Sequence, residues 1–516
     1  MRGKAGPAKI PGLLLAVFAM LALGPPGHCA QSPEADGHRV LQLPNDDTPR
    51  EIIYPYYSLR EGFDSKLEMM DRAPRPVEFR MAIHGISGQT IWAKPMTIQP
   101  NEPLDLDIRE VLTDLSADTH GDFSEGSLSL HFKGKGNPLG GRMLVEGKYV
   151  SWNLGPVWKE GEFGQSMIPQ RLDTFWWDLG GTRDVEIRVD NTSSEAVVAD
   201  LYLDFKGKRH PSAPLHFAPY EMKHLDISQL LAQMGLTAYE APLGGMSIVS
   251  RTAQPVLVAE GNITDSETKR ITGLDFPLSQ MQFASALHAT GVPISTPRAD
   301  SPFAGMGNFT PHVFVRNLLD SEQTVTITVE YPGVTGPDKA VLEPIRVGAF
   351  STEDIRLDSY YYKLPLPLPY CALRIQYNGP HGSLIGKVTT VEENTGKVSD
   401  MVVRNEWDGY AGGLASYWSI GDNKEIYVFF TNMGDKVCRI GMRVDAGGVQ
   451  YFVPHLMVDP HETTYISMRD LRDKQEPDVR GHTIPKDVTE GRLFYNRLDD
   501  VPLEGRIMEL PRRKMH

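Results

Sequence analysis

Aromatic residues are the clearest candidates for ligand binding in this chain. Four of the seven tryptophans lie within the 26 residues from Trp152 to Trp177, accompanied by Gln170, Asp173 and Asp178. Aromatic rings beside polar groups offer an apolar face and hydrogen bonds together, the combination that holds a sugar ring. Tyr149, Trp152, Trp158 and Trp176 are therefore the candidate residues for binding a polysaccharide. The alternative is that these rings pack between neighbouring domains. The tyrosine- and proline-rich residues 360–370 are a second, weaker binding candidate, and a loop that covers a sheet edge is its alternative.

Two further stretches resemble metal sites without completing one. His461-Glu462-Thr-Thr-Tyr465 begins like a zinc-protease helix, but a tyrosine occupies the place of the second histidine. Residues 105–125 carry several acids on which calcium could bind, yet their spacing matches no EF-hand loop, and a solvated acidic face is the simpler interpretation. We predict no metal site and no cofactor.

Catalytic motifs are absent from the sequence. It contains no Gly-x-Ser-x-Gly elbow and no phosphate-binding Gly-x-x-x-x-Gly-Lys-Ser/Thr loop. A non-enzymatic protein is therefore the prediction. A hydrolase whose residues come from separate loops remains an alternative, because fold alone does not exclude it. Its mark would be a cleft that joins two or three titratable side chains from different loops.

The elements that must position any site follow one pattern in four copies. Each copy contains a short run of alternating apolar and polar residues that ends in an asparagine or aspartate, at Asp71, Asn191, Asn317 and Asn432. Fourteen residues before each of these markers stands an aromatic: Tyr57, Trp177, Phe303 and Trp418. Three copies also share a Pro-x-Glu before a later strand, as in Pro219-Tyr-Glu221. Agreement at several ordered points predicts tandem repetition.

Short alternating runs bounded by turn residues predict β-strands with one buried face. The expected fold is all-β, with four tandem immunoglobulin-like β-sandwich repeats. The marker is expected in a turn, where its side chain can bond nearby backbone, and the aromatic is expected in the core. The predicted divisions are a signal peptide (1–30), a flexible leader (31–50), repeat 1 (51–150), the Trp-rich connector with repeat 2 (151–264), a connector with repeat 3 (265–393) and a connector with repeat 4 (394–516).

The N-terminus has the character of an export signal. Arg2, Lys4 and Lys9 precede eleven apolar residues, Leu13 to Leu23, too few to span a bilayer as a helix. Cleavage after Ala30 would leave two cysteines, Cys371 and Cys438, which we expect to be buried free thiols rather than a disulfide framework. The expected location is the periplasm, the cell surface or the extracellular space, with no membrane span in the mature chain. A net charge of −14 argues against nucleic acid as a partner.

Two stretches carry a resemblance to a known class of protein. Residues 291–317, with Gly291-Val-Pro-Ile294 and Phe309-Thr-Pro-His-Val-Phe-Val-Arg-Asn317, and residues 87–102 resemble uncharacterised secreted bacterial proteins of tandem immunoglobulin-like repeats, of the type found in soil acidobacteria. The resemblance implies a fold and a compartment, and no activity. The resulting prediction is an exported structural or interaction protein whose partner is an unknown protein or polysaccharide. Carbohydrate binding through the Trp-rich connector is the alternative.

Overall fold

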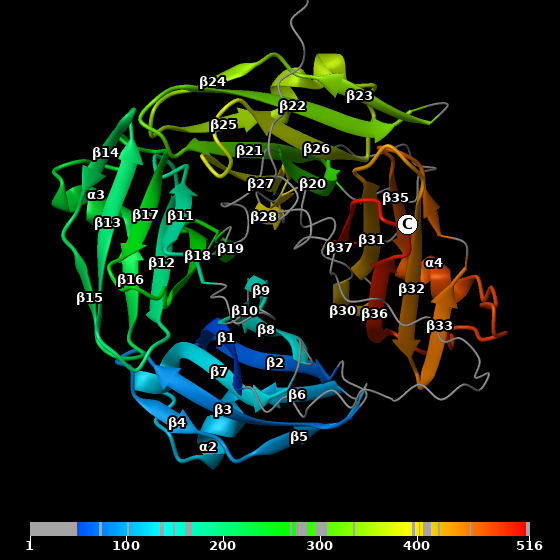
Figure 1. Cartoon of the computed structure of the whole chain (residues 1–516), viewed down its shortest axis with the longest axis horizontal. Helices are drawn as coiled ribbons and strands as arrows, with labels where there is room; N and C mark the ends of the chain where they lie inside the picture. The colour runs from blue at the N-terminus through cyan, green and yellow to red at the C-terminus, as the bar shows by residue number, and fades with distance from the viewer. Residues whose placement is uncertain are drawn as a thin grey trace, which may run out of the picture. The chain divides into compact units, whose positions relative to one another are not determined.

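Antiparallel β-sheets make up most of the described chain, and the all-β expectation is confirmed (Figure 1). The structure is a computed structural model. It describes residues 49–511 except 72–74, 101–102, 135–138, 148–149, 160–167, 269–270, 275, 277–285, 295–306, 334–335, 395–397, 402, 406–413, 422–423 and 455. The predicted signal peptide, most of the leader, Tyr149 and Phe303 lie outside the described residues.

The sheets fall into four pairs, each made by one continuous stretch of chain. The first pair contains β1 (Pro49–Ser58), β2 (Phe63–Asp71), β3 (Val77–Gly85), β4 (Thr90–Trp92), β5 (Met96–Ile98), β6 (Pro103–Asp107), α2 (Ile108–Asp114), η1 (Asp122–Ser124), β7 (Glu125–Lys133), β8 (Leu139–Gly147), β9 (Val150–Leu154) and β10 (Val157–Trp158). The second contains β11 (Arg171–Trp176), β12 (Arg183–Asn191), β13 (Val197–Phe205), β14 (Lys208–Pro211), β15 (Leu215–Phe217), β16 (Met222–Asp226), α3 (Ile227–Gln233), β17 (Gly244–Ser250), β18 (Leu257–Asp265) and β19 (Ile271–Leu274).

The remaining strands form the other two pairs. The third pair contains β20 (Ala286–Pro293), β21 (Phe309–Asn317), β22 (Gln323–Pro332), β23 (Pro337–Val341), β24 (Ile345–Val347), β25 (Thr352–Arg356), η2 (Leu357–Lys363), β26 (Tyr370–Tyr377), β27 (Leu384–Glu392), β28 (Val398–Met401) and β29 (Arg404–Asn405). The fourth contains β30 (Leu414–Ser419), β31 (Lys424–Asn432), β32 (Cys438–Ala446), β33 (Val449–Val453), β34 (Met457–Val458), β35 (Thr463–Ser467), α4 (Met468–Asp473), β36 (Glu490–Arg497) and β37 (Leu503–Pro511).

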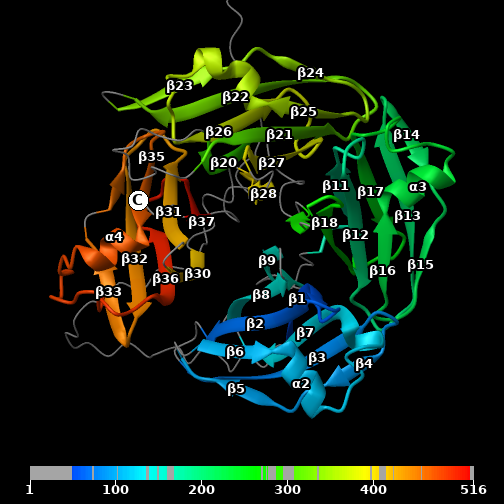
Figure 2. The ribbon, with the colours of Figure 1, turned by 180° about the vertical axis from the view of Figure 1, so that it is seen from behind.

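Strand order is the same in every pair. One sheet has at its centre β1-β7-β3, β11-β17-β13, β20-β26-β22 or β30-β36-β32, and the other has β6-β2-β8, β16-β12-β18, β25-β21-β27 or β35-β31-β37 (Figures 1 and 2). Strands β9 and β10, which the sequence prediction placed in the Trp-rich connector, pair with β8 and β1 of the first pair.

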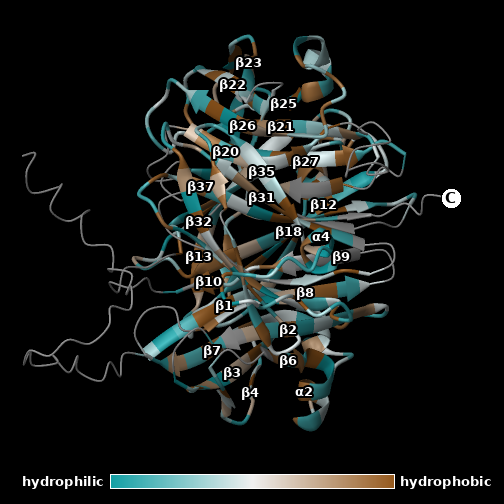
Figure 3. Cartoon of the chain, turned by 90° about the vertical axis from the view of Figure 1, so that its right-hand side faces the viewer, coloured by the Kyte–Doolittle hydropathy of each residue, from teal (hydrophilic) through white to brown (hydrophobic). Residues whose placement is uncertain are grey.

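Apolar side chains fill the space between the two sheets of each pair. Strand β32 shows the pattern, with alternate residues buried from Cys438 to Ala446. Short hydrophobic and hydrophilic segments follow one another along many strands in Figure 3, because successive side chains point to opposite faces. Each fully buried Leu, Ile, Val or Phe contributes about 1.5–3 kcal/mol. Cys371 and Cys438 are both free and buried in these cores.

The marker asparagines tie a turn to a later strand. Asn191, Asn317 and Asn432 are fully buried at the ends of β12, β21 and β31. Each side-chain amide donates to the carbonyl four residues ahead and to a carbonyl of a later segment, and each side-chain oxygen accepts from the N–H two residues ahead. An apolar residue at this position would leave buried backbone groups unpaired, at about 1–3 kcal/mol each.

A second recurrent feature sets a large side chain over a small residue on the adjacent strand. Tyr57 lies opposite Gly126, Trp176 opposite Gly244 and Trp418 opposite Gly491. A Cβ on Gly244 or Gly491 would meet the tryptophan ring opposite it, so the glycines make room for these rings. In the third pair the same register sets Val292 opposite Cys371. A constant spacing predicted Trp177 as the repeated aromatic of the second pair. The register instead places Trp176, one residue earlier, at this position.

Candidate functional site

The side chain of Arg316 points away from the core of its own sheet pair and lies against the outer face of a sheet of the preceding pair, where Asp173, Asp204 and Ser247 lie on the face opposite to the core. Arg316 precedes the buried marker Asn317 on β21, and its side chain has no exposed surface. On this outer face of the β11-β17-β13 sheet, its guanidinium donates to the carbonyls of Thr174 and Met246 at 2.7 and 2.6 Å, to Ser247 Oγ at 2.8 Å and to Asp204 Oδ2 at 2.5 Å. Together with Asp173 Oδ1 at 3.4 Å, these contacts define the Arg316 junction.

Two buried carboxylates, those of Asp173 and Asp204, form ion pairs with the Arg316 guanidinium. Asp173 also accepts from Ser247 Oγ at 2.6 Å and from Arg171 Nε at 2.9 Å. Burial alone would raise the pKa of Asp204, but hydrogen bonds from Arg209 and the charge of Arg316 outweigh it and hold that pKa below its usual value. Asp204 is thus held in its ionised form, and both carboxylates have a cationic partner, as buried charges must have.

Chemically different contacts join the other neighbouring pairs. Between the first and second pairs, the buried carboxyl of Asp190 hydrogen-bonds to Ser127, and burial raises its pKa to about 7. Nearby, His224 lies between Glu125 and Glu186, with nitrogen–oxygen distances of 3.2 and 2.6 Å. Between the third and fourth pairs lies an aromatic cluster of Phe309, Tyr370, Tyr427, Phe429 and Tyr465. Arg316, Asp190 and Thr431 each directly precede a marker asparagine, and the first two form hydrogen bonds with the preceding pair.

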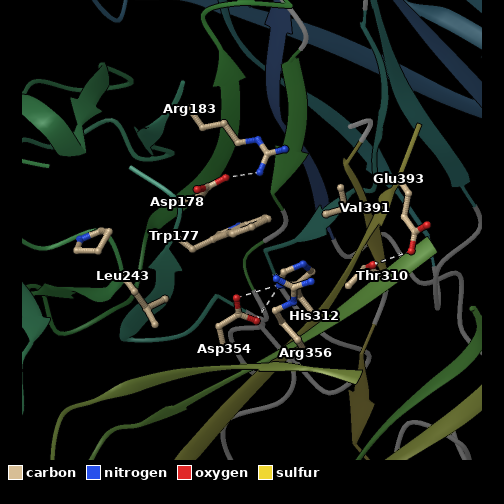
Figure 4. A pocket seen from close by; sticks show the side chains of 11 residues that line it. Trp177, Asp178, Arg183, Leu243, Thr310, His312, Asp354, Arg356, Val391 and Glu393 are labelled. Atoms are coloured by element: carbon tan, nitrogen blue, oxygen red, sulfur yellow. Dashed lines mark hydrogen bonds and ion pairs between the residues drawn. The ribbon is translucent and has the colours of Figure 1, made fainter. Parts of the chain in front are cut away.

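A pocket of about 420 Å³ lies beside the Arg316 junction (Figure 4). The second pair contributes one wall and the third pair the other. Its lining consists of Trp177, Asp178, Arg183, Pro242, Leu243, Thr310, His312, Asp354, Arg356, Val391 and Glu393. Trp177 contacts the third pair directly, because its ring centroid lies 5.0 Å from those of His312 and Phe314.

Short-range pairs fix the polar side chains of the pocket. Arg183 forms an ion pair with Asp178, and its guanidinium lies over the Trp177 ring, 5.3 Å from the centroid. His312 Nδ1 lies 2.9 Å from both carboxylate oxygens of Asp354. Figure 4 shows these two groups on opposite sides of the Trp177 ring.

Two other lining residues are held in the same way. Thr310 Oγ1 donates to Glu393 Oε1 at 3.3 Å. The exposed Arg356 binds Asp358 through Nε and Nη2, at 3.2 and 2.6 Å. The pocket therefore joins titratable side chains from strands β21 and β25 with Asp178 and Glu393, which lie in two different connecting segments. Only these last two match the mark of a loop-borne hydrolase site stated above.

The predicted tryptophan platform is divided by the structure. Trp176 is fully buried in the second pair and donates from Nε1 to the Ala241 carbonyl at 3.0 Å, so its ring is closed to a ligand. Trp152 lies on β9 and Trp158 on β10, in the two different sheets of the first pair. Trp177, assigned to the core by its spacing, is 5% exposed and belongs to the buried core cluster of the second pair, and it also lines the pocket.

The two metal-like stretches are accounted for by local structure. Asp107 caps α2 by accepting from the N–H groups of Arg109 and Glu110, and Asp105 pairs with Lys66. His461 has a φ of 58° in the turn that leads to β35, so no helix begins there. Within the described residues, no group of three or more His, Cys, Asp or Glu side chains is placed to hold a metal ion.

Sequence reasoning missed Arg316, His312, Asp354, Arg356 and Glu393. The available signal was a charged residue at the end of an otherwise apolar run, Val313-Phe-Val-Arg316. The pocket residues lie on segments distant in sequence, and no local pattern joins them.

Comparison of the chain with protein-family models and with curated proteins gave no match in either case. No helix among the described residues is both long enough and apolar enough to cross a membrane.

Proposed function

We propose that the chain is an exported, non-enzymatic structural or interaction protein, built as a rigid array of four tandem immunoglobulin-like β-sandwiches. The observation that carries the proposal is the Arg316 junction. A buried guanidinium with two carboxylates needs a fixed geometry, because removing one charged partner leaves another buried and unpaired. Such a contact holds two sandwiches in one orientation, which suits a protein that spaces or presents binding surfaces.

Three observations support the individual parts of this proposal. The recurrent strand order and the marker spacings of 115–126 residues agree with sandwich domains of immunoglobulin size. The basic and apolar opening of the sequence supports export. The resemblance to secreted bacterial repeat proteins points to the cell envelope or the extracellular space, where the partner would be a protein or a polysaccharide.

Recovery of the native protein from its producing cells tests the proposal. We expect a mature N-terminus at Gln31 and elution from a size-exclusion column in a complex larger than the 57.4 kDa chain. Mass spectrometry of that complex would identify the partner. An isolated monomer without a bound partner, or a chain that keeps its first thirty residues in the cytoplasm, would contradict the proposal.

One alternative has gained a specific observation. The pocket joins His312, Asp354 and Glu393, so a hydrolase with loop-borne residues is the second candidate. The chain would then release p-nitrophenol from ester or glycoside substrates, and His312→Gln would abolish the release. Equal rates with and without the wild-type protein would remove this candidate.

A further inference from the structure

We propose that the pocket between the second and third sheet pairs binds a neutral carbohydrate of one or two sugar residues. This site goes beyond the structural role proposed above and does not depend on it. It is also built from other residues than Trp152 and Trp158, whose strands β9 and β10 belong to the first pair.

The size of the pocket suits a small ligand. A volume of about 420 Å³ far exceeds the roughly 30 Å³ that one water molecule occupies in the liquid. It falls at the lower end of the roughly 300–1,000 Å³ typical of small-molecule sites. Pro242, Leu243 and Val391 supply apolar surface, and the rest of the lining is polar or aromatic. This mixture is expected for a ligand that carries hydroxyl groups on an apolar ring.

The polar lining keeps unused hydrogen-bonding capacity. Among the described residues, Arg183 uses only Nη1 and Arg356 only Nε and Nη2 in side-chain hydrogen bonds. Glu393 accepts through Oε1, which leaves Oε2 without a partner among those same residues. Guanidinium and carboxylate groups are planar and can hold two neighbouring oxygens at once. Adjacent sugar hydroxyls can both donate and accept, so they match this set of free donors and acceptors.

The charges of the pocket favour a neutral ligand over an ionic one. Two arginines face three carboxylates across the lining, and Asp358 lies against Arg356 just outside it. Each guanidinium already has a carboxylate partner, so an anionic ligand would have to displace one. His312 likewise lies against the Asp354 carboxylate, so a cationic ligand would have to displace the histidine to bind this carboxylate. A neutral sugar can bind beside these pairs without breaking any of them.

Trp177 contributes an edge rather than a stacking face. Arg183 lies over its ring, and His312 and Phe314 approach it at 5.0 Å. Only 5% of the residue is exposed. Recognition would therefore depend on hydrogen bonds, and the side chains that decide it are Thr310, Arg356 and Glu393.

Isothermal titration calorimetry of residues 31–516 tests the site. The probes are glucose, galactose, mannose, xylose, cellobiose and lactose, with glucuronate and glucosamine as charged controls. We expect at least one neutral sugar to bind, and Glu393→Gln and Thr310→Val to weaken it tenfold or more. The matched control is Glu267→Gln, an exposed residue outside the pocket, which should bind like the wild type.

Three results would overturn the proposal. The first is that no neutral probe binds when it is present in 10-fold excess over millimolar protein. The second is that glucuronate or glucosamine binds more tightly than every neutral sugar. The third is that Glu393→Gln binds the neutral sugar with undiminished affinity. A Trp152→Ala/Trp158→Ala variant distinguishes the pocket from the tryptophans as the binding site. If this variant loses affinity for the sugar while Glu393→Gln keeps it, the sugar binds at the tryptophans. Circular dichroism of each variant excludes unfolding as the cause of lost binding.

Discussion

The guanidinium of Arg316 donates to the carboxylate of Asp204 at 2.5 Å, although 112 residues separate the two and neither side chain is exposed. Arg316 belongs to the third sheet pair and Asp204 to the second. Their contact converts two neighbouring folding units into one joined body, and the first prediction follows from it.

Replacing Arg316 by methionine should strongly destabilise the junction. The variant keeps much of the length of the side chain but removes the cation that Asp173 and Asp204 share, leaving Asp173 with Arg171 and Asp204 with Arg209. Breaking a buried pair in this way costs about 3–5 kcal/mol. Urea unfolding measures the loss. The matched control is Arg251→Met, which breaks an exposed ion pair with Asp200. Both residues belong to the second sheet pair, and the variant should lose less than about 1 kcal/mol of unfolding free energy. Equal losses in the two variants would contradict the assignment.

Gly245 should tolerate no side chain, because Arg316 occupies the space beside it. A Cβ built at this position would lie 2.1 Å from Arg316 Nε. Gly245→Ala should therefore shift the arginine and destabilise the protein by about 1–3 kcal/mol, the usual range for overpacking. Gly155→Ala is the control, since no atom of the described residues, apart from the two chain neighbours, lies within 4 Å of a Cβ there. Thermal melting of both variants would decide, and an unchanged melting temperature for Gly245→Ala would count against the packing described.

Asp190 should make the contact between the first and second pairs sensitive to alkaline pH. Burial raises the pKa of Asp190 from 3.8 to about 7. A folded-state pKa above the unfolded value means that the protonated carboxyl stabilises the fold. This stabilisation is fully present below pH 3.8 and is lost as the pH rises through about 7, on the order of 4 kcal/mol at most.

Asp190→Asn removes this titration while keeping the shape of the side chain. The stability of the variant relative to the wild type should therefore rise with pH, and its advantage should be clearly larger at pH 8.5 than at pH 5. Chemical unfolding at the two pH values measures the difference, with the exposed Asp320→Asn as control. A stability difference between Asp190→Asn and the wild type that does not change with pH would show that Asp190 does not titrate in this range.

The two buried thiols should report on unfolding. Cys371 and Cys438 are free and have no exposed surface, and burial raises the pKa of both. Because the thiolate is the reactive form, both should react with a disulfide reagent such as DTNB only as the third and fourth pairs open. Reaction of the native protein at the rate of the denatured chain would show that one of these cores is accessible.

The sequence predicted the all-β class because alternation marks every strand that has one buried face, as from Cys438 to Ala446. It did not predict the register of the aromatics. β1 contains an irregularity between Tyr54 and Tyr57, whereas β11 pairs without a shift. The aromatic of the second pair therefore lies fifteen residues before its marker rather than fourteen. Spacing alone cannot distinguish Trp176 from Trp177, because a bulge or a turn of different length in one copy changes the spacing by one residue.

The candidate pocket was beyond sequence reasoning for a related cause. Trp177 and Asp178 were noted as part of an aromatic stretch, but His312, Asp354 and Glu393 come from segments that only sheet packing brings together. Arg316 was equally hidden, because an arginine next to an apolar run is compatible with solvent exposure. Its burial follows from two carboxylates that lie more than a hundred residues away along the chain.

A double-mutant cycle on Arg316 and Asp204 tests the rigid junction most directly. Urea unfolding would be measured for the wild type, Arg316→Met, Asp204→Asn and the double variant. If the two side chains form one buried pair, the double variant should lose little more stability than Arg316→Met alone, with a coupling of about 2–3 kcal/mol. Additive losses, within about 0.5 kcal/mol, would show that the two residues act independently and that the junction does not join the second and third pairs.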